Sequence, residues 1–78
     1  MENINLNERQ SQSQTRRILA YLQKGKSVTS LEALDLFGCM RLSARILDIK
    51  NQGYEIGDEI VRDVRTGKRY KRYWLVGE

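Results

Sequence analysis

Histidine and proline are absent from this chain, and cysteine occurs once, at Cys39. A single cysteine excludes an intramolecular disulfide, and the missing histidines remove the commonest general base and metal ligand. Acidic side chains occur singly, without a paired acid or a phosphate-binding loop. They include Asp35, Asp48, Asp58 and Asp63. We therefore expect a protein that is not an enzyme and needs no metal or other cofactor, with Cys39 as a small buried apolar residue.

Long apolar runs are also missing from the sequence. The stretch Ile18–Leu22 is among the longest, and it is far too short to span a bilayer. The N-terminus has neither the charged start nor the apolar core of a signal peptide. We expect a soluble, cytoplasmic protein without a membrane partner, and the sequence indicates no small-molecule ligand.

What the chain does have is an uneven distribution of positive charge. Its 78 residues carry a net charge of +4, and a chain of this length forms one small domain. Residues 1–59 hold eight basic and eight acidic residues, whereas residues 60–78 hold six basic and two acidic ones. A concentrated basic segment attracts a polyanion such as nucleic acid, although a merely solvating surface has the same composition.

The chain begins with a polar segment that is followed by a helical pattern. Residues 1–13 repeat Ser-Gln and show no apolar period, so we expect a flexible tail there and a folded domain over residues 14–78. Ser13 is a suitable N-cap for a first helix. Apolar residues then recur at helical spacing from Gln14 until Gly25 ends the helix.

A second helix is predicted by its capping residues. Thr29 followed by Glu32 forms a capping box, in which each residue satisfies a free backbone amide of the other. Gly38 ends the helix by permitting a positive φ. Leucines dominate the segment between these residues, so we expect this helix to be short and largely buried.

A third helix is predicted from about Met40 to residue 51 or 52, with Gly53 as its cap. At helical spacing, Leu42, Ile46 and Ile49 form one narrow apolar stripe. Two short helices joined by a turn that contains glycine are typical of the helix-turn-helix unit, whose second helix enters the DNA major groove.

The outer face of the third helix carries the candidate DNA-binding residues. Arg41, Ser43 and Ala44 lie away from the apolar stripe. Small residues permit a close approach to DNA, and arginine reaches guanine edges or phosphates. Arg45 lies between the two faces, so it either contacts DNA or braces the fold by pairing with Asp48. An ordinary amphipathic helix with solvated arginines is the alternative interpretation.

The last third of the chain predicts strands. We expect a short strand at residues 54–56, a turn at 57–58, and a hairpin of strands 60–65 and 68–76 around a two-residue Thr66-Gly67 turn. Alternation along the strands predicts that Ile60, Tyr73 and Leu75 pack on the helices. The basic residues that we expect to project toward a polyanion are Arg62, Arg65, Lys68, Arg69, Lys71 and Arg72. Trp74 falls on the opposite face, which means either a register error of one residue or a contact surface.

These patterns together resemble the small winged helix-turn-helix domains of bacteriophage and prophage genomes. The resemblance covers roughly residues 14–76, and the segments that carry it read QTRRILAYL, VTSLEALDLFG, RLSARILDIKNQGYEI and TGKRYKRYWL. The third string, which begins at Arg41, is the most specific. The resemblance implies an α+β fold in which a three-helix core precedes a C-terminal β-hairpin wing.

The resemblance also implies double-stranded DNA as the partner and a role in transcription regulation of phage or mobile-element genes. The candidate DNA-binding residues are Arg41, Ser43, Ala44, Arg45, Arg65, Lys68, Arg69, Lys71 and Arg72. A homodimer on repeated half-sites stays open. The alternative function is a winged-helix adaptor, or a phage-encoded inhibitor that binds a host protein.

Overall fold

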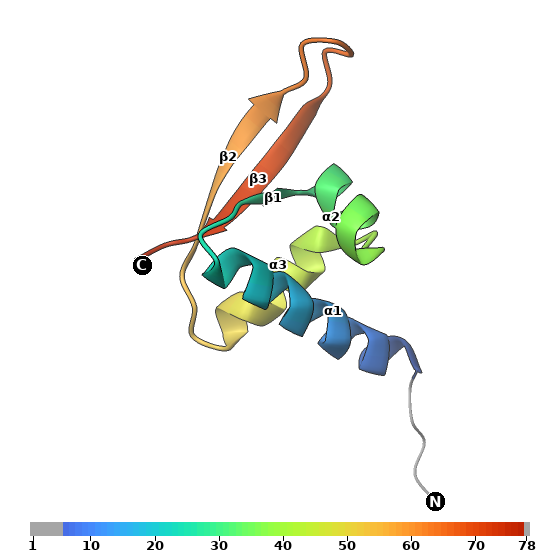
Figure 1. The fold of residues 1–78 in the computed structure, drawn as a ribbon, viewed down its shortest axis with the longest axis vertical. Coiled ribbons are helices and arrows are strands. Elements are labelled where there is room, and N and C mark those ends of the chain that lie inside the picture. The colour runs from blue at the N-terminus through green and yellow to red at the C-terminus, as the bar shows by residue number, and fades with distance from the viewer. Residues whose placement is uncertain (1–5, 78) are drawn as a thin grey trace, which may run out of the picture.

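The structure is a computed structural model that describes the backbone of residues 6–77 and the side chains of residues 12–77. Its elements, in chain order, are α1 (Leu6–Gln23), β1 (Val28–Thr29), α2 (Ser30–Phe37), α3 (Leu42–Asn51), β2 (Ile56–Arg62) and β3 (Arg69–Leu75). The helices cluster at the base of a three-stranded antiparallel sheet, and the β2–β3 hairpin projects away from them (Figure 1). The predicted α+β architecture, a three-helix core followed by a hairpin, is confirmed.

The core lies where the three helices meet the base of the sheet. Every element and the turn before α3 contribute apolar side chains to it: Ile18, Leu22, Val28, Ala33, Cys39, Leu42, Ile46, Ile49, Ile56 and Tyr73. The predicted apolar stripe of α3 is therefore confirmed. Cys39 is 1% exposed and acts as a small core residue, as expected.

Helix α1 is longer than the sequence predicted. It begins at Leu6 instead of Gln14, so residues 6–13, which were expected to belong to a flexible tail, are helical. Extension of an existing helix gains one hydrogen bond for each residue added, and glutamine, glutamate and arginine are good helix formers. The part of the tail prediction that concerns residues 1–5 lies outside the described residues.

The start of α2 agrees with the prediction, whereas its burial does not. The Glu32 backbone N–H donates to Thr29 Oγ1 at 3.2 Å, and the Thr29 N–H donates to Glu32 Oε1 at 2.9 Å, which completes the capping box. The expectation of a largely buried helix is wrong, because Ala33 is its one buried residue. A helix of two turns presents only a narrow face to the core, and its leucines fall outside that face.

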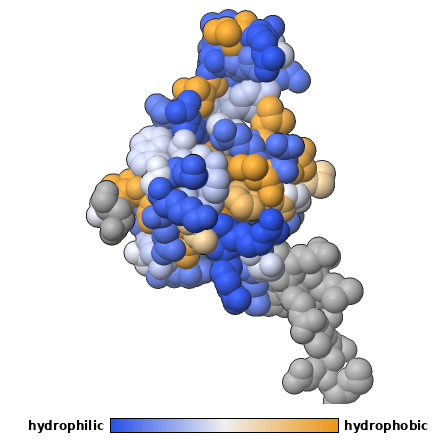
Figure 2. Space-filling view, viewed as in Figure 1, coloured by the Kyte–Doolittle hydropathy of each residue, from blue (hydrophilic) through white to orange (hydrophobic). Residues whose placement is uncertain are grey.

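These leucines give α2 an exposed apolar surface. The exposed fractions are 55% for Leu31, 47% for Leu34 and 46% for Leu36. In Figure 2 hydrophobic colour gathers over α2, whereas the tip of the hairpin is mostly hydrophilic. The side of the molecule that carries α2 is therefore chemically different from the wing-like hairpin.

The strand β1 was not predicted from the sequence. Val28 pairs with Tyr73 and Thr29 pairs with Arg72, so the sheet has the order β1-β3-β2. A strand of two residues has no alternation that a sequence pattern can reveal. Its effect is to attach the start of α2 to the central strand.

The register of the hairpin differs from the prediction by two residues. Ile60 lies opposite Lys71 and Arg62 lies opposite Arg69, and the Asp63 N–H donates to the Lys68 carbonyl at 2.8 Å. The connection is therefore a longer loop over residues 64–67. Either two-residue primed turn centred on Thr66-Gly67 requires positive φ at its first residue, Thr66, which a β-branched side chain disfavours. The observed loop has positive φ at Gly67 alone.

The changed register moves some side chains along the hairpin but keeps them on the predicted face. Tyr73 is buried and Leu75 packs against the core, as predicted. Ile60 was predicted to pack on the helices, and this is wrong, because it lies farther toward the tip and is 65% exposed. Ile56, opposite Leu75, takes the core position instead. The predicted strand at 54–56 and the turn at 57–58 are also wrong, because β2 runs without interruption from Ile56.

The face of Trp74 is explained by the glycine on the neighbouring strand. Trp74 lies on the sheet face opposite Tyr73, pairs with Gly57 and is half-buried. A Cβ atom added at Gly57 would lie only 2.7 Å from Trp74 Cε2. The indole therefore covers the glycine, and no register error of one residue is needed to account for it.

Candidate nucleic-acid interface

The turn between α2 and α3 fixes the direction of the third helix. Gly38 adopts φ 63° and its N–H donates to the Leu34 carbonyl at 3.0 Å, while the Cys39 N–H donates to the Ala33 carbonyl at 3.1 Å. The bond from the left-handed glycine to the carbonyl four residues earlier is that of an αL cap, which reverses the chain after α2. Cys39 then anchors the turn in the core, and Arg41 becomes the exposed N-cap residue of α3.

Helix α3 has three faces with different environments. Its apolar stripe is buried, and a second face turns toward α1. The third face is open, with Ser43, Leu47 and Lys50 exposed and Ala44 half-buried. Residues from this open face line a groove and are accessible to a ligand.

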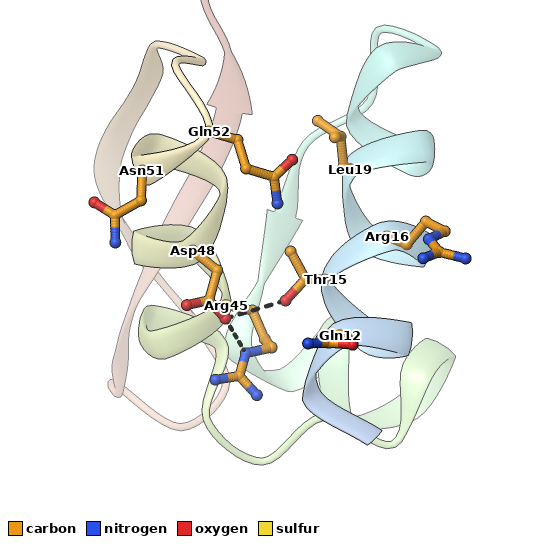
Figure 3. Close-up of a pocket in the computed structure, with 8 residues that line it drawn as sticks. All are labelled: Gln12, Thr15, Arg16, Leu19, Arg45, Asp48, Asn51 and Gln52. Carbon is orange, nitrogen blue, oxygen red and sulfur yellow. Dashed lines mark hydrogen bonds and ion pairs between the residues drawn. The ribbon is translucent and has the colours of Figure 1, made fainter. Parts of the chain in front are cut away.

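Arg45 belongs to the face that turns toward α1. Its Nε lies 3.1 Å from Asp48 Oδ2, and its side chain is 15% exposed. The Thr15 hydroxyl donates to the same Asp48 oxygen at 3.2 Å, and Thr15 is itself 4% exposed. Figure 3 shows these three side chains meeting between the two helices. Of the two roles that the sequence left open for Arg45, the geometry favours bracing α3 against α1.

A polar cleft of about 690 Å³ surrounds this contact. Its walls come from α1 and from α3 with the residue that follows it: Gln12, Thr15, Arg16, Leu19, Arg45, Asp48, Asn51 and Gln52. The cleft is separate from the open face of α3. Sequence reasoning missed Thr15 as the partner of Asp48, because the two residues are far apart in the chain.

The hairpin presents its basic residues in three different settings. Arg62, Arg69 and Lys71 share the sheet face that carries Tyr73, which is the face toward the helices. Arg65 and Lys68 lie in or beside the loop, and both are exposed. The loop itself is held by Asp63, whose Oδ1 accepts the Arg65 N–H at 2.8 Å. Basic residues on this face and at the loop suit the negative surface of a nucleic acid backbone.

Arg72 differs from the other basic residues of the hairpin. It lies opposite Glu59 on the sheet face of Trp74, and its Nη1 is 3.8 Å from Glu59 Oε1. This ion pair is partly exposed and therefore weak. Arg72 nonetheless points to the other side of the sheet, so it is not adjacent to the open face of α3.

A groove of about 400 Å³ joins the open face of α3 to the hairpin. Helix α3 contributes Ser43, Ala44, Ile46, Leu47 and Lys50, and the sheet contributes Asp58, Lys71 and Tyr73. Lys50 and Lys71 give this groove two positive charges, and Asp58 gives it one negative charge. Sequence reasoning missed Lys50, although its spacing from Ser43, seven residues earlier, places both on one side of a helix.

The structure thus divides the predicted site residues into separate groups. Ser43, Ala44 and Lys71 line the groove, while Arg41, Arg65, Lys68 and Arg69 are exposed at the start of α3 or toward the tip of the hairpin. Arg45 lies in the cleft beside α1, and Arg72 lies on the opposite sheet face. The first two groups make up the candidate interface of α3 and hairpin.

Comparison with known proteins gives the same architecture. A family model described as a winged helix-turn-helix domain matches residues 13–78. The comparisons with curated proteins and with solved structures gave no match. Within residues 6–77, none of the helices combines the length and the apolar content that crossing a bilayer requires. The helix-turn-helix unit is a common DNA-binding motif. The family model covers most of the chain, and helix, turn, helix and hairpin follow in the order that such a domain requires, so this chain belongs to the winged helix-turn-helix domain family.

Proposed function

We propose that the protein binds double-stranded DNA with sequence preference, through α3 in the major groove and through the hairpin, its wing, on the backbone or an adjacent minor groove. The observation that carries this proposal is the groove shared by α3 and the wing, which has Lys50 on one side and Lys71 on the other. A basic surface along an exposed helix such as α3 is complementary to the negative charge of a DNA duplex.

The two parts of the interface have different tasks in this proposal. Arg41 and Ser43, which are exposed at the start of α3, contact base edges in this proposal. Arg65, Lys68 and Arg69, near the tip of the wing, contact phosphates, which position the protein without reading sequence. A short helix makes few base contacts, so most of the affinity comes from phosphates and falls steeply with salt.

The biological role that we propose is transcription regulation of phage or mobile-element genes by a binding protein that is not an enzyme. Its support is the resemblance of the string that begins at Arg41 to phage-type domains of this fold. Binding as two copies on a symmetric site would increase an affinity that a single short helix leaves modest.

Selection of bound duplexes from a random pool tests this function directly. We expect an enriched motif, and titration of that duplex at two salt concentrations should give much weaker binding at the higher one. A palindromic motif indicates two copies on one site. Absence of any duplex binding at low salt contradicts the proposal.

A protein-binding adaptor is the second candidate, and one observation favours it. Leu31 and Leu34 are exposed on α2 beside Glu32 and Asp35, so this surface is apolar with an acidic rim. Such a surface suits a protein partner better than DNA. This candidate gains support if the selection yields no duplex and if substitution of Leu31 abolishes binding to a partner protein.

A further inference from the structure

The middle of the open face of α3 is apolar. Leu47 is 56% exposed and lines the groove between α3 and the wing, together with Ser43 and Lys50. The core does not need this side chain, since Leu42 and the isoleucines of the apolar stripe already fill the space beneath α3. In the free protein Leu47 therefore presents its side chain to water at the center of the candidate interface.

The hydrogen-bonding groups of this face are few. Arginine is the side chain that most often recognises guanine, and the one arginine within α3, Arg45, is held beside Asp48 and turned toward α1. Arg41 precedes the helix and Lys50 is near its end. Between them the exposed face offers the hydroxyl of Ser43 and the isobutyl group of Leu47.

An apolar side chain in a major groove has a specific complement. The C5 methyl of thymine is the apolar group that base edges present there, whereas the other edges present hydrogen-bond donors and acceptors. A leucine against a donor or acceptor leaves that polar group without a partner, which disfavours the other bases. The chemistry of Leu47 therefore selects one base.

We propose that Leu47 determines sequence specificity by packing against the C5 methyl of a thymine in the bound duplex. This inference rests on the proposed function, because it requires α3 to enter the major groove. It adds a residue and a base to that function: the preferred site carries thymine at the position that faces Leu47.

Deoxyuridine tests the contact, since it pairs like thymidine and lacks only the methyl group. Each thymine of the selected duplex is replaced in turn, and dissociation constants are measured for the wild type and for Leu47→Ala. Leu36→Ala is the matched control, because Leu36 is 46% exposed and lies on α2, outside the α3–wing groove. Both leucines are exposed, so neither variant is expected to unfold the domain.

We expect at least one thymine whose replacement weakens binding by the wild type about three- to fivefold, the change that corresponds to one buried methyl group. Leu36→Ala should show the same loss, and Leu47→Ala should bind the thymine and the deoxyuridine duplex equally. Equal binding of all deoxyuridine duplexes by the wild type overturns the inference, as does an undiminished loss in Leu47→Ala. If the selection yields duplex binding but no enriched sequence, the inference about Leu47 is overturned while the proposal of DNA binding stands. Failure to bind any duplex at low salt overturns both proposals.

Discussion

The contact between Gly57 and Trp74 leads to a prediction for Gly57→Ala. The sign of the change in its free energy of unfolding depends on whether the Trp74 ring is present. In Gly57→Ala, the new methyl would lie 2.7 Å from Trp74 Cε2 and 2.8 Å from Cζ2 and Nε1. Non-bonded carbons rest about 3.5–4.0 Å apart, so the indole would have to retreat by roughly 0.8 Å or more. The ring is rigid, and movement away from β2 reduces its own packing.

The expected magnitude follows from two opposing effects. Overpacking of this kind costs about 1–3 kcal/mol. Gly57 has no positive φ, so alanine is compatible with its backbone, and the loss of freedom in the unfolded chain stabilises the variant by about 0.4–1 kcal/mol. Gly57→Ala should therefore lower the free energy of unfolding by up to about 2.6 kcal/mol. For a domain of this size, each kcal/mol lowers Tm by roughly 4–8 °C.

A double-mutant cycle with Trp74→Val isolates the contact. Valine keeps the preference for a strand but removes the ring, so Gly57→Ala in that background should be neutral or stabilising by up to about 1 kcal/mol. Urea unfolding followed by circular dichroism measures all four proteins, including those without tryptophan. A Gly57→Ala effect of the same sign and size in both backgrounds would refute the account of the indole covering Gly57.

Three further predictions concern the interface and its support. Replacing Lys68 and Arg69 together by alanine should weaken binding to every duplex and reduce the slope of log K against log salt by about 2, whereas Arg16→Ala should leave this slope unchanged. Arg41→Ala should cost about 1–3 kcal/mol of binding to the selected duplex and relax its preference at one base pair, which competition with single-base variants measures. Arg45→Ala should lower the free energy of unfolding by about 1–2 kcal/mol, because Asp48 loses its ion pair, and should leave the affinity of the folded protein unchanged. A large loss of affinity in a stably folded Arg45→Ala would place this residue in the interface instead.

Local features of the sequence determined the helices and the character of the interface. The capping box of Thr29 and Glu32, the stop at Gly38 and the apolar stripe of α3 depend on residues within one or two turns of each other. Such features can be predicted from the sequence without knowledge of distant contacts. The exposed positions of Arg41 and Ser43 follow from the same helical spacing, and the basic wing follows from the distribution of charge.

Tertiary structure decided how these elements face one another. The partner of Asp48 on α1, the pairing of β1 with β3 and the exposure of Leu31 depend on which distant segment lies opposite each residue. Sequence spacing fixes the direction of a side chain relative to its own helix or strand and does not identify that segment. Sequence spacing alone therefore does not decide whether Arg45 contacts DNA or braces the fold.

The wing shows both contributions, the one that local sequence determines and the one that tertiary structure decides. Alternation along β2 and β3 assigned Ile60 and Tyr73 to one face, and the structure agrees, because the actual register differs from the predicted one by an even number of residues. How far along that face each residue sits was decided by the loop, in which Gly67 alone takes a positive φ. Sequence by itself thus determined the chemistry of each surface, and the packing of distant segments determined which of these surfaces meet, because only packing fixes distances between residues far apart in the chain.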